Sequence, residues 1–214
     1  MTLSIEVLTA EHVAFGYAGT PVLHDVSLRV QAASMVAVTG ANGSGKSTLL
    51  HLLAGVETPT SGSIRRRSGC RLALLPQRTG DIDALPITVA ECVQIGRFTP
   101  WRRLNRSDRA AVATIMERLD LGPLARRRLR ELSGGQRQRT LLAQTLVQVA
   151  DIYVLDEPTV ALDEASRLHV HDLLAERVRA GAAVIFASHD ATEATLADRT
   201  VRLAGVTGGT LLTT

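Results

Sequence analysis

Apolar side chains follow two different spacings along this chain, and each spacing predicts one kind of element. Residues 1–33 alternate between apolar and polar positions, which is typical of antiparallel strands with one buried face. Continuous apolar runs are typical of strands buried on both faces of a parallel sheet. Such runs cover residues 34–39, 71–77, 152–155 and 182–190.

Helical spacing replaces the strand patterns in several segments. Leucines recur every three or four residues within 46–55, which predicts a helix directly after the first buried strand. Residues 81–131 change character, with a helical pattern opened by Pro86 and another over 107–119. Strand and helix then alternate again, and residues 200–203 resemble a last strand. The order of these patterns predicts an α/β fold interrupted by a helical segment.

The nine residues Gly-Ala-Asn-Gly-Ser-Gly-Lys-Ser-Thr at 40–48 match the phosphate-binding pattern G-x-x-x-x-G-K-[ST]. Glycines let the backbone turn tightly and direct N–H groups at phosphate oxygens. Lys46 can then reach the β- and γ-phosphates, and the Ser47 hydroxyl can ligate Mg²⁺. A glycine-rich turn in an unrelated α/β domain would not explain the lysine. The predicted ATP-binding residues of this loop are Gly40, Asn42, Gly43, Ser44, Gly45, Lys46, Ser47 and Thr48.

A second motif, Leu-Ser-Gly-Gly-Gln, covers residues 132–136. Ser133 suits the N-cap of a helix, and two glycines there would leave bare N–H groups for a phosphate. A capped helix with a flexible start explains the serine but not two consecutive glycines, which cost helix stability. With both motifs, the chain resembles the ATP-binding cassette (ABC) ATPases. The resemblance implies that Ser133, Gly134, Gly135 and Gln136 also contact ATP.

This resemblance covers essentially the whole chain and implies its architecture. We expect one ABC ATPase domain over 1–214, built on a P-loop NTPase (RecA-like) α/β core. The core would comprise residues 1–80 and 132–214, including an N-terminal antiparallel β layer. Residues 81–131 would form an inserted α-helical subdomain.

The resemblance also assigns roles to polar residues that follow the apolar runs. Asp156 resembles the Walker B acid that holds Mg²⁺, and Glu157 resembles the general base that polarises water. An acidic turn before a proline is the alternative interpretation of this pair. Gln77 matches a glutamine near Mg²⁺, and His189 matches a histidine that senses the γ-phosphate. Tyr17 resembles the aromatic residue that stacks on adenine, although packing on an edge strand is an alternative.

The amino-acid composition limits the kinds of partner that we expect the protein to bind. The net charge is +3, and arginines gather in clusters that could face phosphates or acidic lipids, or could be solvated surfaces. Aromatic residues are only 3%, so we expect no nucleic-acid stacking platform. The chain contains no apolar stretch near the roughly 20 residues of a membrane helix, and its start does not resemble a secretion signal. We therefore expect a cytoplasmic protein.

The leading functional hypothesis, from the resemblance, is the ATPase subunit of an ABC transporter. Such a subunit binds ATP and Mg²⁺, dimerises head-to-tail with a second copy and drives a separate transmembrane permease at the inner face of the membrane. The segment 85–97 looks most like importers of metal ions or iron chelates, which also use a substrate-binding protein. A soluble ABC ATPase of DNA repair or translation is the alternative. A nucleotide sensor without turnover is disfavoured, because Glu157 and His189 are both present.

Overall fold

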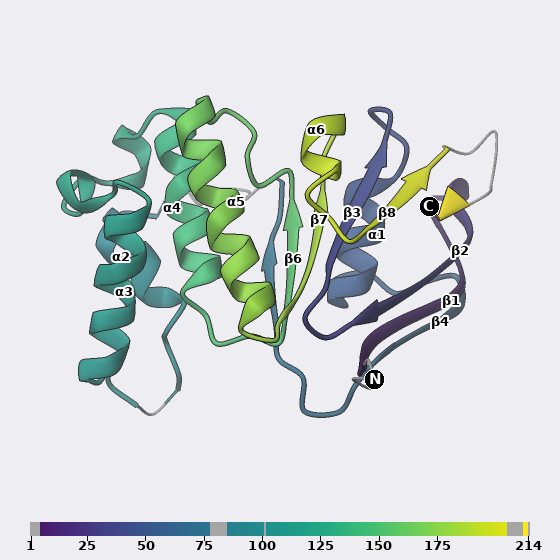
Figure 1. Cartoon of the computed structure of the whole chain (residues 1–214), viewed down its shortest axis with the longest axis horizontal. Coiled ribbons are helices and arrows are strands. Elements are labelled where there is room, and N and C mark those ends of the chain that lie inside the picture. Colours follow the sequence, from purple (N-terminus) through teal and green to yellow (C-terminus); the bar gives the residue numbers. More distant parts are fainter. Residues whose placement is uncertain (1–4, 78–84, 101, 205–211, 214) are drawn as a thin grey trace. The chain divides into compact units, whose positions relative to one another are not determined.

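The computed structural model describes residues 5–77, 85–100, 102–204 and 212–213 (Figure 1). The chain forms two compact units, both discontinuous in sequence. The first unit contains residues 1–77, 150–157 and 174–214, and the second contains residues 78–149 and 158–173. The expected boundary between residues 80 and 81 lies outside the described residues.

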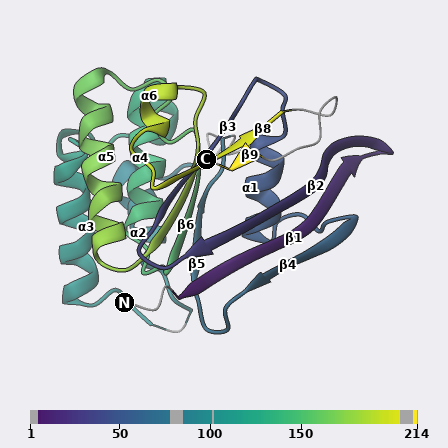
Figure 2. The same cartoon turned by 45° about the vertical axis from the view of Figure 1, so that its right-hand side comes forward.

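An antiparallel sheet of three strands forms one layer of the first unit, in the order β2-β1-β4 (Figure 2). The predicted alternation is confirmed in the described part of residues 1–33, because the buried side chains of β2 are Leu23, Val26, Leu28 and Val30. The third strand was not predicted, since its sequence SGSIRR holds one apolar residue. The strands are β1 (Glu6–Tyr17), β2 (Thr20–Gln31) and β4 (Ser61–Arg66).

The second sheet of this unit has six strands in the order β5-β6-β7-β3-β8-β9. All pairs are parallel except β8 with β9. The four predicted apolar runs are the strands β3, β5, β6 and β7, each with slightly different ends. Every residue of β6 and β7 is buried, which explains their continuous apolar sequence. The strands are β3 (Met35–Gly40), β5 (Leu72–Leu75), β6 (Ile152–Asp156), β7 (Ala183–Ala187), β8 (Arg199–Leu203) and β9 (Leu212–Thr213).

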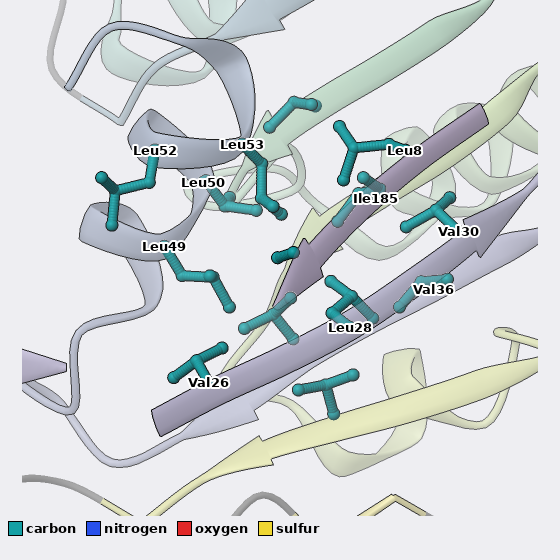
Figure 3. Packing of buried hydrophobic residues seen from close by; sticks show 14 of the residues in the cluster. Leu8, Val26, Leu28, Val30, Val36, Leu49, Leu50, Leu52, Leu53 and Ile185 are labelled. Atoms are coloured by element: carbon teal, nitrogen blue, oxygen red, sulfur yellow. The ribbon is translucent and has the colours of Figure 1, made fainter. Parts of the chain in front are cut away.

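The helix α1 (Lys46–Ala54) follows β3 and packs in the core of the first unit. It ends at Gly55, whose left-handed backbone (φ 77°) lets its N–H reach the carbonyls of His51 and Leu52. Burying a leucine contributes about 1.5–3 kcal/mol, so this helix is a main source of stability. Leu49, Leu50 and Leu53 of α1 point toward apolar side chains of both sheets in Figure 3, and Leu52 is buried on another side of the helix.

The second unit is mainly helical. The helix predicted after Pro86 begins later, at Val89, because Thr88 and Glu91 form a capping box that fixes the start. The pattern over 107–119 is confirmed by α3, which an Asn105 capping box begins at Arg106. Among the described residues, no helix is long and apolar enough to cross a bilayer. The helices are α2 (Val89–Ile95), α3 (Arg106–Arg118), η2 (Gly122–Leu124), η3 (Leu129–Glu131) and α4 (Gly134–Leu146).

Two further helices complete the chain. The helix α5 (Glu164–Arg179) begins in the second unit and ends in the first, since the division falls at Leu174. The short helix α6 (Ala191–Ala194) follows β7 in the first unit. Because β3, β6 and β7 are parallel, their carboxyl ends share one edge of the sheet. Ligands of open α/β sheets bind at that edge.

Candidate active site

The loop after β3 has the backbone that its glycines predict. Gly40 has φ 151°, and a Cβ there would lie 2.6 Å from the Leu203 carbonyl oxygen and 2.6 Å from Ser44 Oγ. Gly45 has φ 96° and occupies the N-cap position of α1, where no side chain caps the helix. The first N–H groups of a helix have no partner within it. The start of α1 is therefore open to an anion, as a phosphate-binding loop requires.

Lys46 is almost fully buried, at 6% exposure. Its Nζ donates hydrogen bonds to the carbonyl oxygens of Gly40 (2.9 Å) and Ala41 (3.1 Å). Both partners are neutral, so they satisfy two of the three ammonium donors without balancing the charge. An anionic ligand at the same loop would supply that balance.

Asp156 ends β6 and is 1% exposed. Within the described residues, neither of its carboxylate oxygens accepts a hydrogen bond of normal geometry. Burial raises the pKa of Asp156 above its ordinary value, and the nearby Ser47 hydroxyl offsets part of that increase without forming a geometrically sound bond. A bare buried carboxylate next to a serine hydroxyl suits a hard cation such as Mg²⁺.

Glu157 follows directly and has the strained backbone conformation φ 49°. Its Oε2 accepts a hydrogen bond of 3.0 Å from Gln77 Nε2. Its Oε1 lies 3.8 Å from Nδ1 of His189, whose side chain is 61% exposed. Gln77, Glu157 and His189, to which the resemblance assigns roles at the active site, therefore lie together although they come from separate segments of the chain.

These side chains share a pocket of about 430 Å³ in the first unit. Val22 of β2 lines it as well, which the sequence analysis missed because Val22 belongs to the same alternating pattern as core valines. Asp156 lies buried behind the surface, and Ser44 is buried within the loop. The lining residues are Val22, Asn42, Gly43, Gly45, Lys46, Ser47, Thr48, Gln77, Glu157 and His189.

Tyr17 is the last residue of β1 and is 48% exposed. Its ring meets Phe15 edge-on, with centroids 4.9 Å apart and an interplanar angle of 87°. Tyr17 is not among the described residues that line the pocket. Its adenine contact stays a prediction.

The Leu-Ser-Gly-Gly-Gln segment lies in the second unit, where the expected cap is confirmed. Ser133 Oγ accepts a hydrogen bond from the Gln136 N–H (3.3 Å), and Gln136 Oε1 accepts one from the Ser133 N–H (3.1 Å). Because Ser133 uses its hydroxyl as an acceptor here, the hydroxyl proton is still available to a phosphate.

The two glycines of this segment serve different purposes. Gly134 is exposed, and a Cβ there would meet no atom within 4 Å, so no neighbouring atom crowds this residue. A Cβ at Gly135 would lie 2.6 Å from the Ala161 carbonyl oxygen. Gly135 therefore lets α4 pack against the loop that follows Glu157, and Gln138 reinforces this packing with a 3.3 Å hydrogen bond to the Pro158 carbonyl. This contact is one that the motif alone did not reveal.

Phosphoryl transfer from a nucleotide requires an anion site and a carboxylate that can hold a cation close to it. The start of α1 and Asp156 supply both at one sheet edge, which places the protein in the class of P-loop nucleotide hydrolases. The ABC transporter family profile matches residues 23–160, which is more than half of the chain. The chain belongs to this family, and its prediction as an ABC ATPase is confirmed.

The relatives extend the similarity over most of the chain. The zinc import ATP-binding protein ZnuC of Cereibacter sphaeroides is 39% identical over 185 residues, covering 86% of this chain and 73% of that protein. The hemin import ATP-binding protein HmuV of Streptomyces coelicolor is 40% identical over 200 residues, covering 86% and 70%. A putative metal-chelate type ABC transporter, solved in an inward-facing conformation, has a TM-score of 0.80 at 28% identity, covering 97% and 82%.

Proposed function

We propose that this chain hydrolyses ATP to power a separate membrane permease that imports a metal ion or a metal chelate. The observation that carries the proposal is the convergence of Lys46, Gln77, Glu157 and His189 on one pocket. The cargo is inferred from relatives whose names specify import of zinc and hemin. The same names favour transport over the alternative roles in DNA repair or translation. The chain would act at the inner face of the membrane through the permease.

Asp156 and Ser47 would hold Mg²⁺, with the Gln77 amide close by. Both oxygens of Asp156 are available for this purpose, since the described residues leave them without hydrogen bonds. A bound Mg²⁺ would neutralise charge on the β- and γ-phosphates. Lys46 would exchange its two carbonyl partners for phosphate oxygens, which form stronger charge-assisted hydrogen bonds.

Glu157 would accept a proton from the attacking water. The water oxygen forms a bond to the γ-phosphorus while the bond to the bridging oxygen of ADP breaks. Gln77 and His189 flank the Glu157 carboxylate from two sides, which supports a shared role in orienting it. His189 is exposed enough to reach a γ-phosphate in this pocket.

Ser133 and Gly134 would contact the γ-phosphate of an ATP bound by a second copy of the chain. Both α1 and α4 present helix N-termini, and one phosphate can use both. A head-to-tail dimer with two such shared sites is symmetric and closed. Substrate would reach the permease from a separate binding protein.

A complementation experiment tests the shared site. Lys46→Ala and Ser133→Arg homodimers should each lack ATPase activity. A mixture forms heterodimers with one doubly damaged site and one intact site, so activity should return if one site suffices. Heterodimers that form, as shown by differently tagged copies, but stay inactive would rule out the head-to-tail arrangement.

Metal accumulation in cells tests the cargo. A strain carrying Glu157→Gln should accumulate less of one metal than the parent, measured by elemental analysis under scarcity of each metal in turn. Glu117→Gln, at an exposed position of α3, is the matched control and should accumulate normally. Unchanged contents of every transition metal would refute the metal cargo while leaving the ATPase assignment intact.

A further inference from the structure

A buried carboxylate lies beside the candidate active site without a role in the chemistry above. Glu193, on α6, is only 6% exposed, and Ser188 at the end of β7 is 2% exposed. The Ser188 hydroxyl donates a hydrogen bond of 2.5 Å to Glu193 Oε2. Carboxylates are rarely buried in a protein unless a specific interaction requires them. The pair flanks His189 in the sequence, which suggests what the interaction is for.

The Ser188 oxygen has a second partner on the other side of His189. It accepts a hydrogen bond from the Asp190 N–H at 3.0 Å. The Ser188 N–H in turn donates to the Val38 carbonyl of β3 at 3.1 Å. These bonds fix the backbone both before and after His189 and connect it to the strand that leads into the phosphate-binding loop.

The direction of the Ser188 hydroxyl depends on Glu193. A hydroxyl has one proton and two acceptor positions, so donating to Glu193 leaves its lone pairs for the Asp190 N–H. The Asp190 carbonyl oxygen, 3.5 Å from the same hydroxyl, is a poorer acceptor. If the carboxylate were lost, the hydroxyl proton would turn toward that carbonyl, and the turn carrying His189 would relax.

Few contacts among the described residues hold the His189 side chain. It is 61% exposed, and its Nδ1 lies 3.8 Å from Glu157 Oε1, which is too long for a hydrogen bond. We propose that Glu193, acting through Ser188, is a positioning residue that sets where the His189 imidazole points in the nucleotide pocket. The proposal rests on the role assigned to His189 in the proposed function.

A double-mutant cycle tests this with steady-state ATPase kinetics. Glu193→Ala should lower kcat by roughly 10–100-fold with little change in the KM for ATP, since misplacement of a reacting group by about 1 Å can cost that much. Glu193→Gln keeps an oxygen acceptor and should recover most of the rate. In a His189→Ala background, Glu193→Ala should have no further effect, because the residue it positions is absent. Thr192→Ala, exposed on the same helix, should behave as the parent.

Two results would overturn the proposal. The first is a double variant whose loss of kcat equals the product of the losses in Glu193→Ala and His189→Ala, which would show that the two residues act independently. The second is a kcat for Glu193→Ala that equals that of the parent. If this variant does not fold, Ser188→Ala takes its place in the cycle with the same expected results. A parental rate for His189→Ala would refute the proposed role of the histidine, and this inference with it, while the roles of Lys46 and Glu157 would stand.

Discussion

Replacing Asp156 by asparagine should stabilise the nucleotide-free protein while removing its response to Mg²⁺. The carboxylate is 1% exposed, and within the described residues its oxygens lack hydrogen-bond partners. Its pKa in the folded state is raised, chiefly by burial. The charge therefore opposes folding at neutral pH. Asparagine has nearly the same shape and carries no charge.

The size of the effect follows from this environment. A substitution that relieves one unfavourable group is commonly worth about 0.5–2 kcal/mol. For a chain of this length each kcal/mol shifts Tm by about 2–4 °C, so we expect a rise of roughly 1–8 °C. Saturating nucleotide should raise the stability of the parent more than that of Asp156→Asn. A ligand at about 100 times its Kd adds about 2.7 kcal/mol to the parent, and the Mg²⁺-dependent part of this should be absent in Asp156→Asn.

The pH dependence of stability is a separate test of whether Asp156→Asn is more stable than the parent. A carboxyl whose folded-state pKa is raised contributes its full stability only below the unfolded pKa of about 3.9 and loses it as the pH rises through the folded value. The advantage of Asp156→Asn should therefore be largest at neutral pH. It should shrink as the pH falls through the folded-state pKa of the parent.

Thermal unfolding at several pH values measures the nucleotide-free stability and its pH dependence. The same measurement with a non-hydrolysable ATP analogue, with and without Mg²⁺, gives the Mg²⁺ response. Asp151→Asn is the matched control, because Asp151 accepts a 2.8 Å hydrogen bond from the Arg71 N–H and is partly exposed. This control should be slightly less stable than the parent and should keep its Mg²⁺ response. A lower Tm for nucleotide-free Asp156→Asn, or an intact Mg²⁺ response, would refute the reasoning.

Three further variants test the other residues. Lys46→Ala should lose tight binding of a fluorescent ATP analogue, since it removes the buried cation of the loop; unchanged affinity together with unchanged turnover would contradict the assignment. Glu157→Gln should bind ATP normally and hydrolyse it about 10²–10⁴-fold more slowly, with an ATP-bound dimer accumulating on a sizing column; near-parental turnover would leave Glu157 as an acidic turn residue. Gly135→Ala should lower the free energy of unfolding by about 1–3 kcal/mol in denaturant titrations, because its Cβ would lie 2.6 Å from the Ala161 carbonyl; parental stability would show that the loop yields freely.

The central strands β3, β6 and β7 of the parallel sheet were predictable because their residues are buried on both faces. Such a strand needs an unbroken apolar sequence, and β6 and β7 have one. The edge strand β4 was missed because burial does not constrain its sequence to the same degree. The start of α2 was predicted too early, although the Thr88 to Glu91 spacing of a capping box was present in the sequence.

Within the site, motifs predicted the residues whose chemistry is tied to a local backbone shape. The phosphate-binding loop is of this kind, since its glycines and lysine act through one turn and one helix start. Partners joined only by the tertiary fold gave no signal. The contact of Gly135 with the Ala161 carbonyl oxygen does not follow from spacing along the chain. It depends on which segments the fold brings together.

The position of β3 inside its sheet has a consequence for synthesis of the protein. The strand that leads into the phosphate-binding loop pairs with β7 and β8, whose paired residues lie 149 and 163 positions later in the chain. At about 5–20 residues per second, a ribosome needs roughly 7–30 s to complete those partners after the loop has been made. Leu203, whose carbonyl oxygen lies close to Gly40, is at the end of β8 and is synthesised after β7. In a nascent chain, β3 therefore has neither of its sheet partners until β7 and β8 have been made, and chaperones can bind it during that time.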